Sequence, residues 1–222
     1  QSKRVDGILF TGGPRSERNV ELLSTLSIPV VLLDRRVGSQ LSAGITNNRL
    51  GGVLATEHLI KKGRRRIAFI SGPAELSSVQ ERRQGYAEAL EQYGLAPDQD
   101  LIQAGDFSFE SGYQAASRLV ASGQEFDGVF AANDLMAIGA IEYLAAYGLR
   151  VPAEIAVTGY DDIRMAGWYK PSLTTVRQPV YIMGQSAVKM IIDRITGENR
   201  QYREQIITPE LVVRESSGGK EG

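Results

Sequence analysis

Short apolar segments alternate with longer, helix-patterned segments along most of this 222-residue chain. The short segments have the length of buried strands, and the longer ones repeat apolar residues at helical spacing. The expected strands are residues 5–10, 30–33, 67–70, 128–132, 155–159, 173–176 and 211–214, and the expected helices are 16–26, 50–62, 81–93, 110–121, 135–147 and 182–195. This alternation predicts an α/β fold with parallel sheets and helices on their faces.

Two of the expected strands end in polar side chains. Asn133 and Asp134 follow the fourth strand, and Asp161 and Asp162 follow the fifth. Open α/β sheets bind small ligands in a crevice at the carboxyl ends of their parallel strands. Because asparagine both donates and accepts hydrogen bonds while aspartate only accepts them, this set suits a polyhydroxylated or heterocyclic ligand.

Composition excludes several classes of protein. Charge is nearly balanced, with 25 Lys+Arg against 26 Asp+Glu, so this part of the chain is not a general nucleic-acid binder held by phosphate contacts. The absence of cysteine excludes disulfides and thiolate chemistry. No apolar run approaches the ~20 residues that span a bilayer, and the first residues lack the core of a signal peptide. These features are compatible with a cytoplasmic protein, which is the localisation we expect, and they give no sign of a membrane partner.

The sequence offers little for catalysis. Its single histidine, His58, provides neither a metal cluster nor a Ser-His-Asp relay, and we expect it to be structural. Gly12-Gly13-Pro14 is not followed by the Lys-Ser/Thr of a phosphate-binding loop, and a Gly-x-Gly-x-x-Gly loop is also lacking. An enzyme with a Rossmann-like core therefore ranks low, and we predict no catalytic residue, cofactor or metal.

A series of segments in order along nearly the whole chain resembles the LacI/GalR family of bacterial transcription regulators, specifically its effector-binding domain. The most characteristic are Ala132-Asn133-Asp134 and the run that ends in Gly159-Tyr160-Asp161-Asp162. The matching segments are residues 5–9, 29–35, 55–60, 65–70, 82–86, 105–108, 132–134, 148–152, 155–162, 173–179 and 209–216. Each alone is weak evidence, but together, in this order, they are highly specific.

The resemblance implies two Rossmann-like lobes of the type I periplasmic-binding-protein kind, connected by three crossings of the chain. It predicts an N-terminal lobe from residues 1–45 and 180–205, a C-terminal lobe from residues 46–179 and 206–216, and a tail at 217–222. We expect the tail to be disordered from Ser216 onward. Relative to the family, the N-terminal lobe lacks its first βαβ unit, a piece of at least ~30 residues. We therefore expect a fragment of a longer protein, with strand edges and apolar surface exposed in that lobe.

The resemblance also implies a function. Members of the family bind a small effector in the cleft between the lobes and act as homodimers on near-palindromic operator DNA through an N-terminal helix-turn-helix domain. The effector expected here is a sugar or a sugar derivative, and a purine is the alternative. A periplasmic sugar-binding protein of a transporter is the rival function, because it shares the fold.

Two residues are the leading candidates for effector contact by the resemblance. Asp161 would accept hydrogen bonds from ligand hydroxyls, and Arg82, three residues before Gly85, would donate to two adjacent hydroxyls or to a carboxylate. The structural alternatives are a helix N-cap for Asp161 and a solvated surface arginine for Arg82, as expected for its neighbour Arg83. Asp162 is expected to brace the loop.

Four further residues complete the predicted contacts. Phe107 would stack on the apolar face of a sugar, with core packing as the alternative. Asn133 would contact the ligand while also capping the helix that follows it. Asp34, at the end of an expected strand, and Gln178, on a crossover strand, would also reach the effector. For Asp34 the alternative is an ion pair with a neighbouring arginine.

Overall fold

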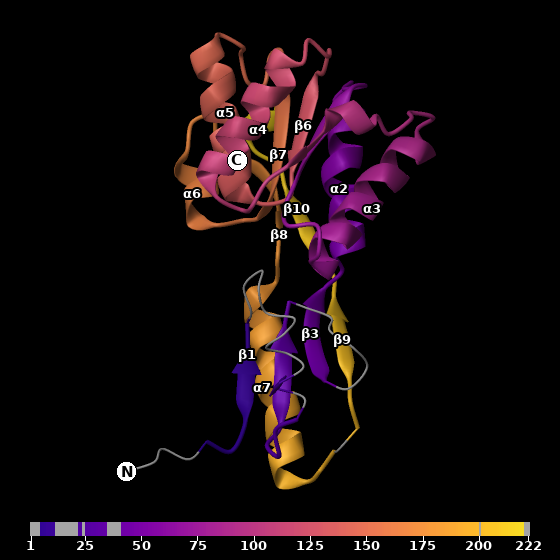
Figure 1. Cartoon of the computed structure of the whole chain (residues 1–222), viewed down its shortest axis with the longest axis vertical. Helices are drawn as coiled ribbons and strands as arrows, with labels where there is room; N and C mark the ends of the chain where they lie inside the picture. The colour runs from indigo at the N-terminus through magenta and orange to yellow at the C-terminus, as the bar shows by residue number, and fades with distance from the viewer. Residues whose placement is uncertain (1–4, 12–21, 24, 35–40, 200, 220–222) are drawn as a thin grey trace. The chain divides into compact units, whose positions relative to one another are not determined.

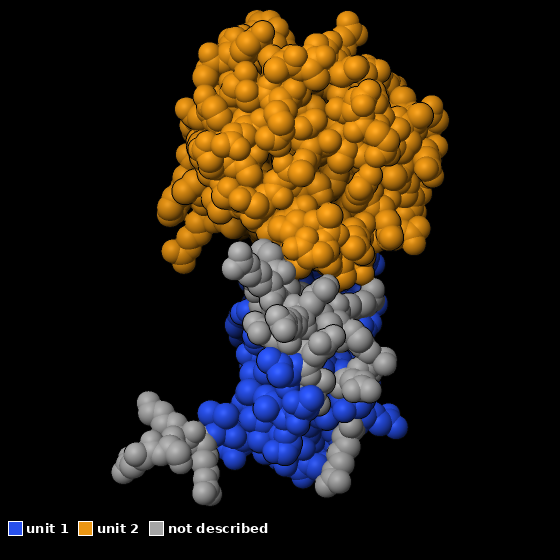
Figure 2. All heavy atoms as spheres, in the orientation of Figure 1, with its two compact units in different colours: residues 1–47, 179–208 blue, residues 48–178, 209–222 orange. Residues whose placement is uncertain are grey.

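The chain forms two compact units. The computed structural model describes residues 5–11, 22–23, 25–34, 41–199 and 201–219. Unit 1 draws on residues 1–47 and 179–208, and unit 2 on residues 48–178 and 209–222 (Figure 2). Residues 16–21 and 24 of the expected helix at 16–26 lie outside the described residues.

Unit 1 is a parallel sheet with one long helix packed against it (Figure 1). The strand order is β1-β2-β3-β9, and every neighbouring pair runs parallel. The elements are β1 (Ile8–Phe10), β2 (Val30–Leu33), β3 (Ser42–Thr46), β9 (Glu204–Ile207) and α7 (Val180–Thr196). α7 buries one helical face, made of Met183, Ala187, Met190 and Ile191, and Val31 of β2 packs in the same cluster.

Two strands of unit 1 were not predicted from the sequence. β3 begins with the small residues Ser42, Ala43 and Gly44, yet it is fully buried because β2 and β9 pair with it on either side. β9 begins with the exposed Glu204 and Gln205, whose side chains give no apolar signal. Both strands are held by backbone pairing with their neighbours. This pairing cannot be predicted from the local strand preference of their residues.

Unit 2 is a six-stranded sheet with helices on both faces. The order is β10-β8-β7-β6-β4-β5, parallel except for the antiparallel edge strand β10. Figure 1 shows α2 and α3 on one face and α4 and α5 on the other. The elements are α2 (Asn48–Lys61), β4 (Ile67–Ser71), α3 (Ser77–Gln92), the 3-10 turn η1 (Gln99–Leu101), β5 (Ile102–Ala104), α4 (Phe109–Ala121), β6 (Gly128–Ala131), α5 (Asp134–Tyr147), β7 (Ala156–Asp161), α6 (Arg164–Trp168), β8 (Thr174–Arg177), β10 (Glu210–Val212) and the 3-10 turn η2 (Glu215–Ser217). The predicted α/β class with parallel sheets is confirmed.

The central strands of unit 2 are buried on both faces and carry the main core. Phe69 of β4 lies 5.2 Å, centroid to centroid, from both Tyr86 of α3 and Phe130 of β6. The Tyr86 hydroxyl donates to the carbonyl of Ile67 at 2.7 Å, so its polar end is satisfied inside the core. This core supports the carboxyl edge of the sheet, where the polar residues gather.

Glycines let α2 and α3 approach closely. A Cβ on Gly85 would lie 2.0 Å from the carbonyl oxygen of Arg49, and one on Gly52 would lie 2.2 Å from that of Arg82. No side chain can occupy these positions without moving one helix away from the other. This close contact therefore fixes the position of Arg82 on α3 relative to α2.

Replacing Gly85 with alanine should destabilise unit 2 by about 1–3 kcal/mol, the usual cost of overpacking a tight contact. The expected loss exceeds the small gain in helix propensity that alanine brings. Urea unfolding followed by circular dichroism measures the change. Gly167→Ala in α6 is the matched control, because a Cβ there meets nothing within 4 Å. Equal stability of the two variants would contradict the helix contact described here.

The expectation of a disordered tail from Ser216 is wrong for residues 216 to 219. Ser216 and Ser217 are buried in η2, with 0% and 2% of their surface exposed. The Ser216 hydroxyl donates to the carbonyl of Val157 at 2.7 Å and accepts from the backbone amide of Thr174 at 2.9 Å. Small hydroxyl residues look like a disordered tail in sequence, but here they satisfy buried backbone groups of two strands.

His58 takes part in the same anchoring contact. Its Nε2 lies 2.8 Å from Ser217 Oγ, and burial, helped by nearby Lys62 and Lys61, lowers the pKa of the imidazole to about 4. A neutral ring in a hydrogen bond to a buried serine is a structural arrangement, as the sequence predicted.

Within the described residues no helix is both long and apolar enough to cross a membrane.

Candidate ligand site

Five of the six residues predicted to contact a ligand lie in unit 2, at or beside the carboxyl edge of its sheet. Asp161 ends β7, Asn133 follows β6 and Gln178 follows β8. Phe107 lies in the turn between β5 and α4, and Arg82 reaches the edge from α3. Because parallel strands end at the same edge, residues far apart in the chain become neighbours here.

Arg82 is a buried cation held by several partners. Its side chain is 3% exposed, Nε donates to Asn48 Oδ1 at 2.9 Å and Nη1 donates to the carbonyl of Ala132 at 2.6 Å. Its guanidinium carbon lies 3.6 Å from the centroid of the Tyr160 ring, a cation–π contact. The alternative of a solvated surface arginine is therefore wrong for Arg82, whereas the next residue, Arg83, is exposed as expected.

Asp161 lies beside this cation. Its Oδ1 is 3.8 Å from Arg82 Nη1 and accepts a hydrogen bond from Gln178 Nε2 at 2.7 Å. The Asp161 side chain keeps 30% exposure while Gln178 is buried. Asp161 does not cap α6, whose N-cap is Ile163. The arrangement presents a partly exposed acceptor next to a fixed donor, with Gln178 orienting the carboxylate.

Phe107 and Asn133 are bonded to each other. Asn133 Nδ2 donates to the carbonyl of Phe107 at 2.9 Å, and Asn133 Oδ1 accepts from the backbone amide of Met136 at 2.9 Å as the N-cap of α5. The predicted cap is thus present. The structure adds a function that the sequence did not predict, because Asn133 holds the turn that carries Phe107. A Cβ on Gly72 would lie 2.4 Å from the Phe107 ring, so the ring requires a glycine beside it.

Asp162 braces the loop after β7, as predicted. Its two carboxylate oxygens accept from Arg177 Nε and Arg214 Nη2, each at 2.6 Å, and its side chain is only 8% exposed. Arg177 belongs to β8, and Arg214 follows β10. These ion pairs tie the loop to two strands at the sheet edge.

Asp134 lies beneath the site and was not among the predicted contacts. Its carboxylate is fully buried and accepts from Thr175 Oγ1 at 2.5 Å and from the backbone amide of Ile163 at 2.9 Å. Burial, reinforced by the charges of Asp161 and Asp162, raises the pKa of Asp134 to about 7 against its hydrogen bonds. Its position after a buried strand was the sequence signal, but that signal did not distinguish a supporting group from a ligand contact.

Positive φ angles gather among the same residues. In the described part of the chain the non-glycine residues with positive φ are Asp34 at 59°, Phe107 at 73°, Asp161 at 114° and Asp162 at 56°. Such backbone conformations are uncommon for side chains of this kind, and they concentrate at functional sites, where the surrounding contacts enforce them. Three of the four are predicted ligand residues.

Asp34 is the one predicted contact that lies in unit 1. It follows β2, and its backbone amide donates to the carbonyl of Gly44 at 2.9 Å. The five residues in unit 2 contact one another directly or through a single neighbour. Its role as a ligand contact stays a prediction.

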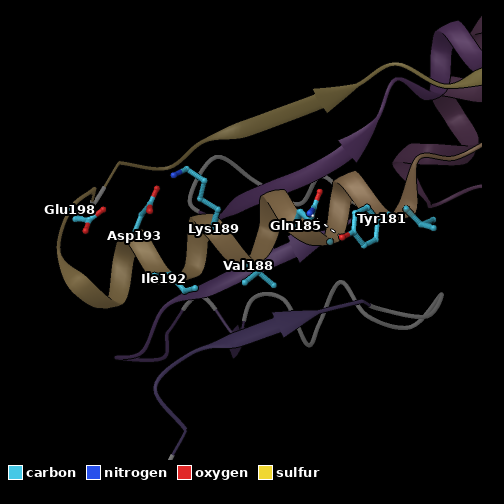
Figure 3. A pocket seen from close by; sticks show the side chains of 9 residues that line it. Tyr181, Gln185, Val188, Lys189, Ile192, Asp193 and Glu198 are labelled. Atoms are coloured by element: carbon cyan, nitrogen blue, oxygen red, sulfur yellow. Dashed lines mark hydrogen bonds between the residues drawn. The ribbon is translucent and has the colours of Figure 1, made fainter.

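A hollow lies on unit 1, along α7. It encloses about 770 Å³ and contains none of the predicted ligand residues. Figure 3 shows Tyr181, Val188 and Ile192 along the helix, with Gln185 bonded to the Tyr181 hydroxyl at 3.2 Å. Its walls are mainly apolar and exposed, with Tyr181 75% and Ile192 51% accessible. Its polar side chains are Gln185, Lys189, Asp193 and Glu198.

Comparison with known proteins identifies the fold's family. Residues 56–217 match the family model of the periplasmic binding protein-like domain. The chain is 39% identical over 217 residues to the HTH-type transcriptional regulator CelR of Thermobifida fusca, covering 96% of this chain and 64% of that protein. It therefore spans a little less than two thirds of that regulator.

Solved structures of transcription regulators give the same result as the sequence comparison. A CelR–cellobiose complex superposes with a TM-score of 0.92 at 39% identity, covering 97% of this chain and 67% of the other. A sugar-binding regulator of the LacI family from Escherichia coli superposes with a TM-score of 0.84 at 30% identity, covering 96% and 77%. The chain therefore belongs to the LacI family of transcription regulators and corresponds to their periplasmic-binding-protein-like, effector-binding domain.

Proposed function

We propose that this domain senses a sugar or a sugar derivative through Arg82, Asp161 and Phe107. The observation that carries the proposal is the buried Arg82 fixed beside the partly exposed Asp161, with Gln178 bonded to the carboxylate. A rigid donor next to an acceptor fits two hydroxyls on adjacent ring carbons. The related CelR has been solved with cellobiose, which supports the sugar class.

Each residue has a separate part in the proposal. Asp161 accepts from one hydroxyl and Arg82 donates to its neighbour, while the Phe107 ring packs against the C–H face of the sugar. Asn133 and Gln178 hold Phe107 and Asp161 through their hydrogen bonds. Asp34 would add a contact from unit 1. Preorganised groups of this kind bind well because little conformational freedom is lost on binding.

The wider biology follows the family and is part of the same proposal. The domain would act as a homodimer in the cytoplasm and control operator DNA through a helix-turn-helix, as the name of the CelR relative indicates for that protein. Its role would be regulatory and not catalytic. Ligand binding can shift DNA affinity only if the effector prefers one conformation of the protein over another.

Calorimetric titration of the 222-residue chain with cellobiose tests the sugar assignment, and Asp161→Asn tests the site. Losing a charged acceptor for ligand hydroxyls should weaken binding about 10- to 100-fold, because hydrogen bonds to charged groups contribute about 1.5–3 kcal/mol each. Glu154→Gln is the matched control, since it removes an exposed carboxylate that pairs only with Arg150 at 2.8 Å and 3.0 Å.

Titration with hypoxanthine and with other disaccharides separates the alternatives. Binding of hypoxanthine without any sugar would replace the sugar assignment by a purine. Equal cellobiose affinity in Asp161→Asn and in the unmodified chain would remove Asp161 from the site. Family membership disfavours a sugar-binding protein of a transporter. Binding to operator DNA would be expected of a transcription regulator and not of a transporter's binding protein.

A further inference from the structure

We infer that the sugar recognised at the carboxyl edge of unit 2 is uncharged, and that the site excludes sugar phosphates and sugar acids. The inference rests on the proposed function and adds the charge of the ligand that the same site takes. It follows from how the arginines and carboxylates of this edge are already paired.

Arg82 cannot offer an uncompensated positive charge. Its Nη1 lies 3.8 Å from Asp161 Oδ1, so an anion placed on the guanidinium also approaches a carboxylate. The side chain is buried and held by Asn48 and by the carbonyl of Ala132, which prevents it from swinging out to meet a distant phosphate. Bidentate pairing with a phosphate uses two N–H groups of one arginine fork, and two of the N–H groups of Arg82 already donate to Asn48 and Ala132.

The other arginines of this edge are also occupied by carboxylates. Arg177 and Arg214 both bind Asp162 at 2.6 Å, and Arg177 Nη1 is also bonded to Glu210 at 2.7 Å. Arg82, Arg177 and Arg214 therefore each have an acidic partner, and this pairing disfavours an incoming anion.

Hydrogen-bonding chemistry gives the same answer independently of net charge. A sugar hydroxyl can donate to Asp161 and accept from Arg82 at the same time. An ionised phosphate or carboxylate carries acceptors only, so it would satisfy Arg82 and leave Asp161 facing another acceptor. Two like charges about 5 Å apart near a protein surface repel strongly enough to weaken binding roughly 100-fold.

Matched ligand pairs test this inference. Cellobiose is compared with phosphorylated cellobiose, and methyl glucoside with methyl glucuronide, by calorimetric titration of the unmodified chain and of Asp161→Asn. The unmodified chain should bind each neutral sugar at least roughly 100-fold more tightly than its anionic partner. Asp161→Asn removes the repelling charge, so the neutral-to-anionic ratio should fall at least tenfold, while Glu154→Gln should keep it.

The outcomes separate this inference from the proposed function. Tighter binding of the anionic sugars to the unmodified chain would overturn the charge inference and leave sugar sensing in place. An equal neutral-to-anionic affinity ratio in Asp161→Asn and in the unmodified chain would do the same. Failure of every sugar, neutral or charged, would overturn both. If Asp161→Asn does not fold, salt decides. A tenfold rise in NaCl should strengthen binding of the anionic sugars relative to cellobiose, because salt screens their repulsion by Asp161, and weaker relative binding would overturn the inference.

Discussion

Replacing Asp134 with asparagine should make the protein more stable at pH 8, and the advantage over the unmodified chain should disappear towards pH 4. The reason is that the Asp134 carboxyl is fully buried and has a pKa raised to about 7. Asparagine keeps an acceptor for the Ile163 amide and places an NH2 that can donate to Thr175 Oγ1, which reverses the direction of that bond, but it cannot ionise. The variant thus resembles the protonated carboxyl at every pH.

The sign of the pH effect follows from proton binding. A raised pKa means that the folded chain keeps a proton on Asp134 up to about pH 7, whereas the unfolded chain releases it near the ordinary aspartate pKa of 3.8. The stabilisation from the neutral carboxyl is complete below about pH 4 and is lost as the pH rises to about 7. A shift of about three pKa units corresponds to about 4 kcal/mol in the free energy of unfolding.

Urea unfolding of both proteins between pH 4.5 and 8, followed by circular dichroism, measures this. The stability difference between Asp134→Asn and the unmodified chain should grow by about 3 kcal/mol over that range. Glu154→Gln, which removes an exposed carboxylate, should show no such growth. Parallel pH curves for Asp134→Asn and the unmodified chain would mean that Asp134 titrates in its ordinary range.

Replacing Arg82 with alanine should cause the largest loss of ligand affinity of any single change in unit 2, about 100-fold or more. The change removes the charged donor from the proposed site, and hydrogen bonds of this type contribute about 1.5–3 kcal/mol each. It also leaves Asn48 Oδ1 and the carbonyl of Ala132 without this donor and opens space over Tyr160. We expect a simultaneous destabilisation of about 2–4 kcal/mol.

Arg83→Ala is the matched control for Arg82→Ala, because Arg83 is the next residue, is exposed, and bonds only to Gln99 at 3.0 Å. Arg82→Lys should lie between them, since an ammonium keeps the charge but lacks the planar fork that reaches both partners. Affinity is measured by calorimetric titration at a temperature where circular dichroism shows each variant folded. Equal affinity in Arg82→Ala and Arg83→Ala would contradict the proposed site.

The fold was predicted well where apolar strands and helical periodicity were strong. The strand at 30–33 was predicted with the bounds that β2 has, and the helix at 135–147 differs from α5 by one residue. The short strands β5 and β9 were missed, because their exposed or partly buried residues carry no strong pattern and their pairing is set by distant parts of the chain.

The sequence named five residues that the structure brings to one sheet edge, but it did not give the bonds between them, and their role as ligand contacts stays a prediction. Asp161 and Arg82 were named from the resemblance, and the structure places them 3.8 Å apart. The bond from Asn133 to the carbonyl of Phe107 was not predictable, because it joins residues 26 positions apart through a backbone atom. The burial of Asp134 could likewise not be predicted from the sequence, because a carboxylate that follows a strand can equally lie at the surface.

The interleaved connectivity of the two units has a consequence for synthesis on the ribosome. Unit 1 begins before residue 48 and is completed only by residues 179–208, after nearly all of unit 2. β3, the strand that β2 and β9 flank, has only one of its two neighbours until β9 emerges. The nascent chain therefore holds an unfinished sheet with an open edge while unit 2 is being made, a period in which pairing with other chains or holding by a chaperone would matter most.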